Sequence, residues 1–360
     1  MSNAAAFSPD YTAARARFRS SALALGCELE EHAIGEQGPD GEELTLDLAR
    51  LGEASARKVV VVSSGLHGVE GFLGSAVQAA LLEDQLGGWR PQKDCALVLI
   101  HALNPYGFAW IRRVDQDNID LNRNFLVDDE VYEGAPGLYE PLDEFFNPRH
   151  PPNPLEPFKL RAALKIVQFG MPALKDTLPV GQYEYPEGMF FGGTGPSKTQ
   201  QILDRELPRW FGQAEHVLHV DFHTGRGKWG TYLLVANREA DDPRMARLRE
   251  IFGDVIEDWA PTETLYTIRG GFGTWCQHKL PHVTYDELTA EFGTYYTIKV
   301  VEALRRENMA HHYCTPGDSA LERAKEQLKE TFAPADTAWR ESCVAQGLEI
   351  VGKAIEATFG

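Results

Sequence analysis

Two residues of types that bind metal ions, His67 and Glu70, lie three positions apart directly after a run of β-branched residues. The run Val59–Val62 predicts a short buried strand, and the apolar residues after Glu70 recur at helical spacing, so the pair lies where a strand turns into a helix. Open α/β sheets bind ligands at such carboxyl ends of strands. Zinc accepts imidazole and carboxylate ligands, and a catalytic site needs three of them plus an open position. Alone, the spacing is better explained by a turn histidine followed by a Glu that favours the helix N-terminus.

A third candidate ligand lies at the end of another apolar segment, residues 217–224. Alternation with a period of two puts His219 and His223 on the same face of this predicted strand. His223 is the last of its histidines before a Thr-Gly break, so it can meet the first pair at the carboxyl end of the strand, whereas His219 lies deeper. We therefore predict His223 as the third ligand, with His101 and His219 as alternatives.

A carboxylate near the end of a later predicted strand, Val283–Thr294, is a candidate general base. Glu291 precedes Gly293 and a predicted helix, so its side chain could face the metal. Glu287 and Asp286 are alternatives, and a strand Glu without a function is the other interpretation.

Three arginines fall within Trp110–Phe125, in a protein that is otherwise acidic. Arg112, Arg113 and Arg123 could form a local anion site, because guanidinium groups bind carboxylates with two hydrogen bonds and keep their charge when buried. An equally good interpretation is a structural network with the nearby aspartates, which are Asp115, Asp117 and Asp120.

The chain of 360 residues is long enough for one large α/β domain with a substantial core, and we predict a single catalytic domain over 1–360. Eleven of its 21 prolines lie between Pro136 and Pro196. Residues 126–200 are therefore predicted to be a Pro/Gly-rich insertion with a short helix near 160–167. Within it, residues 181–193 could line a substrate pocket or only cover the sheet. Residues 318–360 are predicted to form C-terminal helices.

The remaining periodicities predict a helix, an edge hairpin of two strands, and further strands and helices along the chain. These elements are a helix at 11–26, strands at 27–34, 44–48, 96–100 and 231–235, and helices at 243–259 and 295–308.

The formal net charge of -18 argues against nucleic acid or an anionic membrane as the main partner, because phosphate neutralisation needs clustered Lys and Arg. The N-terminus lacks a basic segment followed by an apolar stretch, and no segment approaches the length of a membrane span. We therefore expect a cytoplasmic location. The five cysteines have no Cys-x-x-Cys spacing, so we expect neither a disulfide framework nor a thiolate zinc site.

Several motifs occur in an order that, taken together, resembles the zinc metallocarboxypeptidase (carboxypeptidase A-like) family between about Val59 and Tyr296. Arg113 precedes Asn122 by nine residues, and Tyr266 is followed by Gly270-Gly271, similar to the mobile tyrosine loop of that family. The other motifs are His67-Gly-Val-Glu70, Asn104-Pro-Tyr-Gly107, Asp120-Leu-Asn-Arg-Asn-Phe125, Asp221-Phe-His223 and Ala290-Glu-Phe-Gly293.

The resemblance implies an α/β fold with a mixed, mostly parallel eight-stranded sheet flanked by helices, of the phosphorylase/hydrolase-like type. It implies one Zn²⁺ per chain, with Arg113 polarising the scissile carbonyl and Glu291 acting as base. The implied metal ligands are His67, Glu70 and His223, and the implied substrate-binding residues are Asn122, Arg123, Tyr266 and, from the arginine-rich segment, Arg112.

The predicted function is that of a zinc-dependent hydrolase, a metallocarboxypeptidase, which cuts an amide bond next to a free carboxylate. The sequence is also similar to an uncharacterised bacterial branch that shares features with the aspartoacylase and succinylglutamate desuccinylase deacylases. An N-acyl amino acid deacylase is therefore the enzymatic alternative. A non-catalytic binding module on the same scaffold is a third hypothesis.

Overall fold

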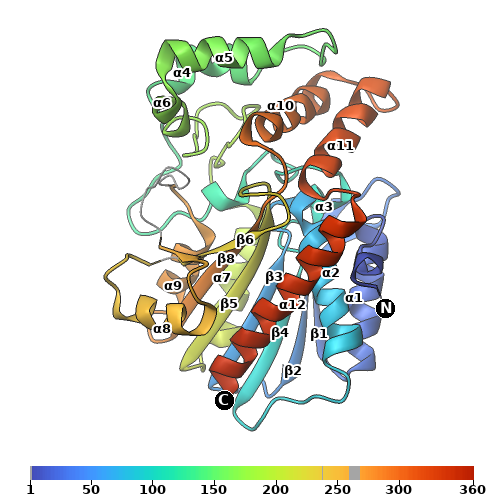
Figure 1. Ribbon diagram of the computed structural model, residues 1–360, viewed down its shortest axis with the longest axis vertical. Coiled ribbons are helices and arrows are strands. Elements are labelled where there is room, and N and C mark those ends of the chain that lie inside the picture. The colour runs from blue at the N-terminus through green and yellow to red at the C-terminus, as the bar shows by residue number, and fades with distance from the viewer. Residues whose placement is uncertain (1, 237, 259–267) are drawn as a thin grey trace.

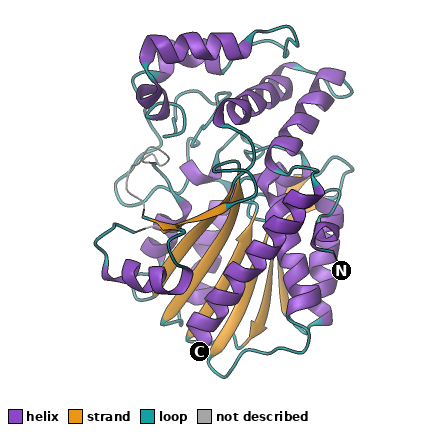
Figure 2. Ribbon diagram, viewed as in Figure 1, coloured by secondary structure: helices purple, strands orange, loops and turns teal. Residues whose placement is uncertain are grey.

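A computed structural model describes residues 2–236, 238–258 and 268–360. Its eight strands form one sheet in the order β1-β2-β4-β3-β5-β8-β6-β7, with parallel pairing through the centre, β4-β3-β5-β8. The predicted mixed, mostly parallel eight-stranded sheet flanked by helices is confirmed (Figure 2). The strands are β1 Glu28–Gln37, β2 Glu43–Gly52, β3 Lys58–Ser64, β4 Cys95–His101, β5 His216–Thr224, β6 Tyr232–Ala236, β7 Ile256–Glu257 and β8 Thr284–Phe292.

Helices cover both faces of the sheet. On one face, the apolar sides of four helices share a core with the even-numbered residues of β5 and β8. These helices are α1 Tyr11–Ala24, α2 Gly71–Ala80, α8 Pro243–Phe252 and α12 Thr337–Phe359, and Figure 1 shows α12 lying across the sheet. On the other face lie α7 Lys198–Phe211 and α9 Phe272–Lys279. This second face carries the odd-numbered residues of β5 and β8, and therefore the candidate site.

The predicted insertion forms a separate group of helices beyond the carboxyl edge of the sheet (Figure 1). Its helices α4 Tyr139–Phe146, α5 Phe158–Phe169 and α6 Met171–Lys175 lie beside α10 Thr297–Tyr313 and α11 Ser319–Phe332. Aromatic and aliphatic side chains of α4, α5, α10 and α11 make a shared core that also contains Val69 and Phe332. The turn that carries two candidate ligands is thus buried beneath this group.

The shorter helical segments complete the structure. They are η1 Asn3–Ala6, η2 Gly68–Glu70, the π-helical η3 Leu81–Gln85, α3 Pro105–Ala109 and η4 Leu121–Arg123. In the described part of the chain, no helix combines the length and apolar character needed to cross a membrane.

Most predicted elements are confirmed, and the exceptions have local causes. The edge hairpin is present as β1 and β2, each longer than predicted. The helix predicted at 243–259 instead ends at Phe252, because Gly253 adopts a φ of 82° that stops it. Helix α10 continues to Tyr313 rather than Asn308. Helix α7 was not predicted, since it begins inside the proposed insertion and contains Pro208.

Helix α2, which follows the turn at 67–70, packs unusually close to the sheet. A Cβ built on Gly74 would lie 2.5 Å from Cβ of Ser64 on β3 and 3.1 Å from Cβ of Phe222 on β5. Real Cβ atoms do not approach that closely, so only glycine lets the helix pack at this distance.

We predict that Gly74→Ala lowers the free energy of unfolding by about 1–3 kcal/mol, the usual cost of overpacking. Helix propensity alone would act in the opposite direction by roughly 1 kcal/mol. Urea denaturation of wild type and variant measures the difference in their free energies of unfolding. The matched control is Gly352→Ala within α12, where a Cβ would meet only Gln85 at 3.6 Å. This control should be neutral or stabilising, and equal losses in both variants would contradict the packing argument.

Candidate metal centre

The three predicted metal ligands meet at the carboxyl edge of the sheet. His67 lies in the turn after β3, Glu70 ends η2, and His223 is the penultimate residue of β5. Nδ1 of His67 is 2.9 Å from one Glu70 oxygen, and Nδ1 of His223 is 3.0 Å from the other. The two Nδ1 atoms are 3.2 Å apart. All three residues are buried, so their donor atoms converge in a place with little access to solvent.

The second ring nitrogen of each histidine is held by an aspartate. Nε2 of His67 lies 3.2 Å from Asp120 Oδ1, and Nε2 of His223 lies 2.7 Å from Asp221 Oδ2. A carboxylate only accepts hydrogen bonds, so Nε2 of each ring donates and Nδ1 can present a lone pair to the centre. Carboxylate partners of this kind orient ligating imidazoles and increase their basicity.

The electrostatics of the group favour a cation. Burial alone would lower the pKa of His223, but Asp221 and Glu70 together raise it well above its ordinary value. Burial would raise the pKa of Glu70, yet the neighbouring histidines hold it below its usual range. The carboxylates therefore remain charged and favour positive charge at the point where the donors meet.

The donor set fits zinc. Two imidazole nitrogens at a zinc–nitrogen distance of roughly 2.0–2.1 Å, at a tetrahedral angle, lie about 3.3 Å apart. The observed separation of 3.2 Å is close to this value. Two nitrogens and one carboxylate also make the three-ligand set that leaves a coordination position open in catalytic zinc sites. The buried His-Glu-His group is consistent with such a site.

The alternative histidines have other roles. His101 contacts the Ser75 hydroxyl at 3.0 Å, and its ring stacks on Phe18. His219 lies between the hydroxyls of Ser63, at 2.7 Å, and Tyr285, at 2.8 Å. Burial lowers the pKa of each of these two imidazoles to about 4. Neither belongs to the group of ligands.

Close backbone contact fixes the turn at 67–70. The N–H of Gly68 donates to the Arg113 carbonyl at 3.1 Å, and a Cβ on Gly68 would lie 2.0 Å from the carbonyl carbon of Gly107. The Asn104 side chain accepts from the Gly107 N–H at 2.8 Å and donates to the Arg113 carbonyl at 3.3 Å. The Asn-Pro-Tyr-Gly motif thus provides the surface on which the turn docks.

Arg113 lies at the edge of the ligand group, and its role at the reacting carbonyl stays a prediction. Its Nη1 is 3.1 Å from Glu70 Oε1, and its Nε is 2.9 Å from Asp120 Oδ2. Burial alone would raise the pKa of Asp120, but Arg113 and His67 hold it well below its usual range. One ionised aspartate therefore positions both a candidate ligand and the arginine beside it.

Asn122 and Arg123 lie together on η4, directly after Asp120. The Asn122 side-chain oxygen accepts from the N–H of Phe272 at 3.1 Å, which joins η4 to the start of α9. The Arg123 guanidinium donates to the carbonyls of Pro179, at 2.8 Å from Nε, and Asn122, at 2.6 Å from Nη1. Arg123 is buried, so the protein itself fixes its orientation.

Residues 181–193 of the insertion reach back to these arginines. The guanidinium carbons of Arg113 and Arg123 lie 5.2 Å and 5.7 Å from the centre of the Phe190 ring. The carbonyl of Phe191 accepts from the N–H of Asp120 at 2.7 Å. The segment therefore contacts the candidate site, and its lining of a substrate pocket stays a prediction.

Arg112 lies in the interior. Its Nε donates to Glu307 on α10 at 2.9 Å and its Nη2 donates to Asn118 at 2.9 Å, and the residue has no exposed surface. This placement does not support the substrate contact predicted for Arg112. The sequence could not distinguish the roles of Arg112 and Arg113, because the two residues are adjacent. In the structure their side chains point in different directions, Arg112 to Glu307 and Arg113 to Glu70.

Glu291 lies beside the ligand group. It pairs in register with His223 across β5 and β8. Its Oε2 is buried, and no side chain or backbone group of the described residues makes a hydrogen bond to it. Burial raises the pKa of Glu291 and nearby Glu70 adds to this, whereas His223 and Arg226 oppose it. Arg226, three residues after His223, was not predicted to contribute to the site.

No role was predicted for Asp120 and Asp221 beyond their motifs and, for Asp120, pairing with an arginine. For Asp221 a signal was available, because a residue two positions before His223 on one strand must share its face. Tyr266 lies outside the described residues, so its assignment stays a prediction. The nearby Gly270 is described, and its carbonyl accepts from the N–H of Phe125 at 3.1 Å.

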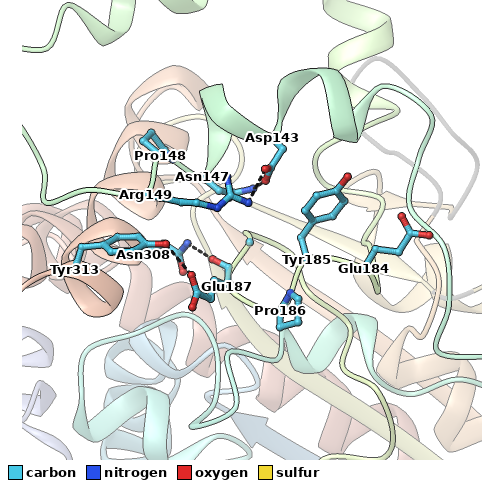
Figure 3. Close-up of a pocket in the computed structure, with 11 residues that line it drawn as sticks. Asp143, Asn147, Pro148, Arg149, Glu184, Tyr185, Pro186, Glu187, Asn308 and Tyr313 are labelled. Atoms are coloured by element: carbon cyan, nitrogen blue, oxygen red, sulfur yellow. Dashed lines mark hydrogen bonds and ion pairs between the residues drawn. The ribbon is translucent and has the colours of Figure 1, made fainter.

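A cavity of about 290 Å³ opens elsewhere, between the insertion and the end of α10 (Figure 3). Its polar groups bond mainly to one another, such as Arg149 with Asp143 at 2.8 Å and the Tyr313 hydroxyl with Glu187 at 2.7 Å. None of the predicted site residues lines this cavity. The cavity therefore adds no group to the site.

The sequence matches one family model, described as Protein of unknown function (DUF2817), over residues 7–346. The chain belongs to this family. No curated protein matches the DUF2817 chain in sequence.

Solved structures show what the fold of this DUF2817 protein is similar to. Bovine thrombin-activatable fibrinolysis inhibitor, in complex with tick carboxypeptidase inhibitor, matches with 11% identity and a TM-score of 0.52, over 98% of this chain and 97% of that one. A second structure of thrombin-activatable fibrinolysis inhibitor matches with 12% identity and a TM-score of 0.53, over 97% and 74%. Carboxypeptidase A from Helicoverpa armigera matches with 12% identity and a TM-score of 0.47, over 91% and 73%. The DUF2817 chain therefore has a fold similar to that of thrombin-activatable fibrinolysis inhibitor.

We predict that the purified DUF2817 protein carries about one zinc per chain, because three ligands with an open position define one site. His223→Ala should lower this occupancy sharply, since it removes one of the three converging donor atoms. Elemental analysis by mass spectrometry measures it. His216→Ala is the control, because His216 begins the same strand but contacts Asp286 at 3.2 Å, away from the ligand group. Loss of metal from the control and its retention in His223→Ala would refute the assignment.

Proposed function

We propose that this protein is a zinc-dependent hydrolase that cuts an amide bond next to a free carboxylate, and that it acts as a metallocarboxypeptidase. The observation that carries the proposal is the buried His67-Glu70-His223 group with an aspartate behind each imidazole. A purely structural cluster would not need three inward-facing donors.

His67, Glu70 and His223 would hold the metal. When bound, zinc polarises a carbonyl and lowers the pKa of water toward about 7. The chain's own residues would supply the remaining chemistry, namely proton transfer, stabilisation of the developing oxyanion and binding of the substrate carboxylate.

Glu291 is the proposed general base. It would take a proton from the attacking water and return it to the leaving amine, a role that requires a carboxylate near the ligands whose pKa is raised toward neutrality. Burial raises its pKa in this way, and its Oε2 makes no hydrogen bond with the described residues that would compete with water. The register with His223 supports this role, because it keeps Glu291 beside the ligand group.

Arg113 would stabilise negative charge on the carbonyl oxygen. Its guanidinium is already oriented by Asp120, so little reorganisation is needed as charge develops. Its contact with Glu70 Oε1 keeps the guanidinium within reach of the ligand group.

Asn122 and Arg123 are proposed to bind the free carboxylate of the substrate. They lie one after the other on η4, next to the start of α9, and an amide beside a guanidinium matches a carboxylate with charge-assisted hydrogen bonds. A peptide with a free C-terminal carboxylate is the substrate class that fits these roles.

Glu291→Gln should retain zinc but lose most turnover, because positioned acid–base catalysis contributes on the order of 10²–10⁴ in rate. Zinc content and kcat are measured on the same preparation, with a panel of peptides and N-acyl amino acids as substrates. Glu70→Gln should instead weaken metal binding itself. The exposed Glu326→Gln on α11 controls for the loss of one carboxylate. Full activity of Glu291→Gln would remove the base from the proposal.

The carboxylate-binding role predicts discrimination between a peptide and its C-terminal amide. Wild type should prefer the free acid by about tenfold to a hundredfold in kcat/KM, the value of roughly 1.5–3 kcal/mol of charge-assisted hydrogen bonding. Arg123→Lys should lose much of this preference, because an ammonium cannot reproduce the planar fork. Equal kcat/KM values for both substrates in wild type would refute the carboxypeptidase assignment.

A further inference from the structure

Helix α5 of the insertion carries apolar side chains on two opposite faces. On one face, Phe158 and Ala162 are buried in the core shared with α4, α10 and α11. With 3.6 residues per turn, Leu160 lies about 200° around the helix from Phe158, and Leu164 and Val167 fall on its side. These three residues are 62%, 60% and 85% exposed. A helix that is apolar all round is normally buried, so the second face is suited to a partner.

The exposed apolar surface continues past both ends of the helix. Leu155 in the preceding loop is 87% exposed, and Met171 at the start of α6 is 40% exposed. Five of the nine large apolar side chains that are exposed among the described residues therefore lie between positions 155 and 171. We call these five residues the outer face: Leu155, Leu160, Leu164, Val167 and Met171. Single exposed apolar residues are ordinary, whereas such a concentration marks an interaction surface.

The segment that carries the outer face differs in charge from the protein as a whole. Residues 157–175 contain four basic residues and no acidic residue, although the chain has a formal net charge of -18. The Lys159 ammonium lies 5.9 Å from the centre of the Tyr296 ring, and the Lys165 ammonium lies 5.5 Å from that of Phe169. Neither lysine forms an ion pair with a described residue. Their charges are therefore available to an anionic partner.

A second copy of this chain fits the outer face poorly. Stable dimers bury roughly 800 Å² on each partner through about 20–30 residues, far more than five apolar side chains supply. A two-fold contact between two outer faces would also bring the lysines of both copies together, because such a contact uses the same surface twice.

A membrane surface with anionic lipids matches the observed combination of side chains. Amphipathic helices that lie in this boundary place leucine-like residues among the acyl chains and lysines at the headgroups. Tyr296, beside Lys159, is 57% exposed, and tyrosine is enriched at the level of the headgroups. Figure 1 shows α5 at one end of the longest axis of the molecule, where a broad surface can reach it.

The net negative charge of the chain does not oppose this contact strongly. Charges farther away than the Debye length, about 8 Å at physiological salt, are largely screened. Helix α5 packs on α4, α10 and α11, and one helix with its side chains is roughly 10–12 Å thick. The sheet and the helices on its two faces therefore lie beyond this range.

We propose that the outer face attaches the protein to membrane surfaces that contain anionic lipids. The apolar side chains of the outer face enter the acyl boundary, and Lys159 and Lys165 contact the lipid phosphates. A free phosphate would not use the apolar residues, so the ligand is the lipid surface itself. The attachment needs no spanning helix. It is independent of the proposed hydrolysis, because α5 carries none of the candidate site residues.

The first experiment is co-sedimentation with vesicles of phosphatidylcholine alone and of an equal mixture with phosphatidylglycerol. Wild type should bind the mixed vesicles more tightly, and added salt should weaken that binding. The double variant Leu160→Gln/Leu164→Gln should bind at least about tenfold more weakly, since burial of leucine side chains is lost. Leu23→Gln is the matched control, because Leu23 on α1 is 61% exposed and lies outside the outer face.

The lysines are tested separately with Lys159→Gln and Lys165→Gln. Each should weaken binding to the mixed vesicles by about fivefold, the usual contribution of one lysine near an anionic surface. Lys353→Gln on α12, which removes a lysine that pairs with Glu349, should behave as wild type. No binding to any vesicle, equal binding to both kinds, or unchanged binding of the double leucine variant would each overturn the proposal. A dimer in ultracentrifugation that the double leucine variant dissociates, without vesicle binding, would assign the outer face to a second copy instead.

The second experiment locates the outer face in the bilayer. A polarity-sensitive fluorophore is attached to Val167→Cys in a Cys314→Ser background, since the other four native cysteines are buried. Its emission should shift to the blue with mixed vesicles and be quenched by lipids that carry nitroxides on their acyl chains. The same label on Leu23→Cys should change little. A label at position 167 that stays in water while the protein sediments with vesicles would refute the proposed contact.

Discussion

The buried carboxylate of Asp120 is the interaction on which the candidate site depends. One oxygen holds Nε2 of His67, and the other holds Nε of Arg113. The first oxygen also accepts from the backbone N–H of Asn122 and so caps η4, and the N–H of Asp120 donates to the carbonyl of Phe191 in the insertion. Two segments that are distant in sequence, around His67 and Phe191, therefore meet Arg113 and η4 on one residue with no exposed surface. Removing its charge would take the ionised acceptor away from both the His67 imidazole and the Arg113 guanidinium, so the cost would reach well beyond one hydrogen bond.

A second polar chain supports the other imidazole from within the sheet. His219 bridges the Tyr285 hydroxyl and Ser63, and Ser63 donates to Asp221 Oδ1 at 2.5 Å, whose other oxygen holds His223. Buried polar groups are tolerated when each has a partner, and linked hydrogen bonds strengthen one another. The odd-numbered face of β5 can therefore be polar at His219, Asp221 and His223, whereas Leu218, Val220 and Phe222 on the other face join the apolar core. The histidine that is not a ligand thus stabilises the aspartate that orients one.

Sequence patterns predicted those site residues whose positions follow from the geometry of the strands. Period-two alternation separated His223 from His219 by depth, and the strand-to-helix transition placed His67 and Glu70 at the same edge, because carboxyl ends of parallel strands coincide. Side-chain direction in irregular segments was not predictable in this way. Arg112 and Arg113 are adjacent, yet one turns to α10 and the other to the ligands. The helices α7 and α9 were missed, since each carries a residue, proline or glycine, that weakens the helical pattern.

The insertion shows why a long irregular segment can be part of a site. Phe190 has a φ of 58°, a left-handed value that is unfavourable for an aromatic residue, and its ring lies against both Arg113 and Arg123. Backbone strain of this kind persists only where surrounding contacts compensate for it, and here two guanidinium groups lie close to the ring. The ring also excludes water from one face of each arginine, which strengthens their interactions with anions. The segment therefore does more than cover the sheet: it sets the local polarity in which the two arginines would meet a substrate.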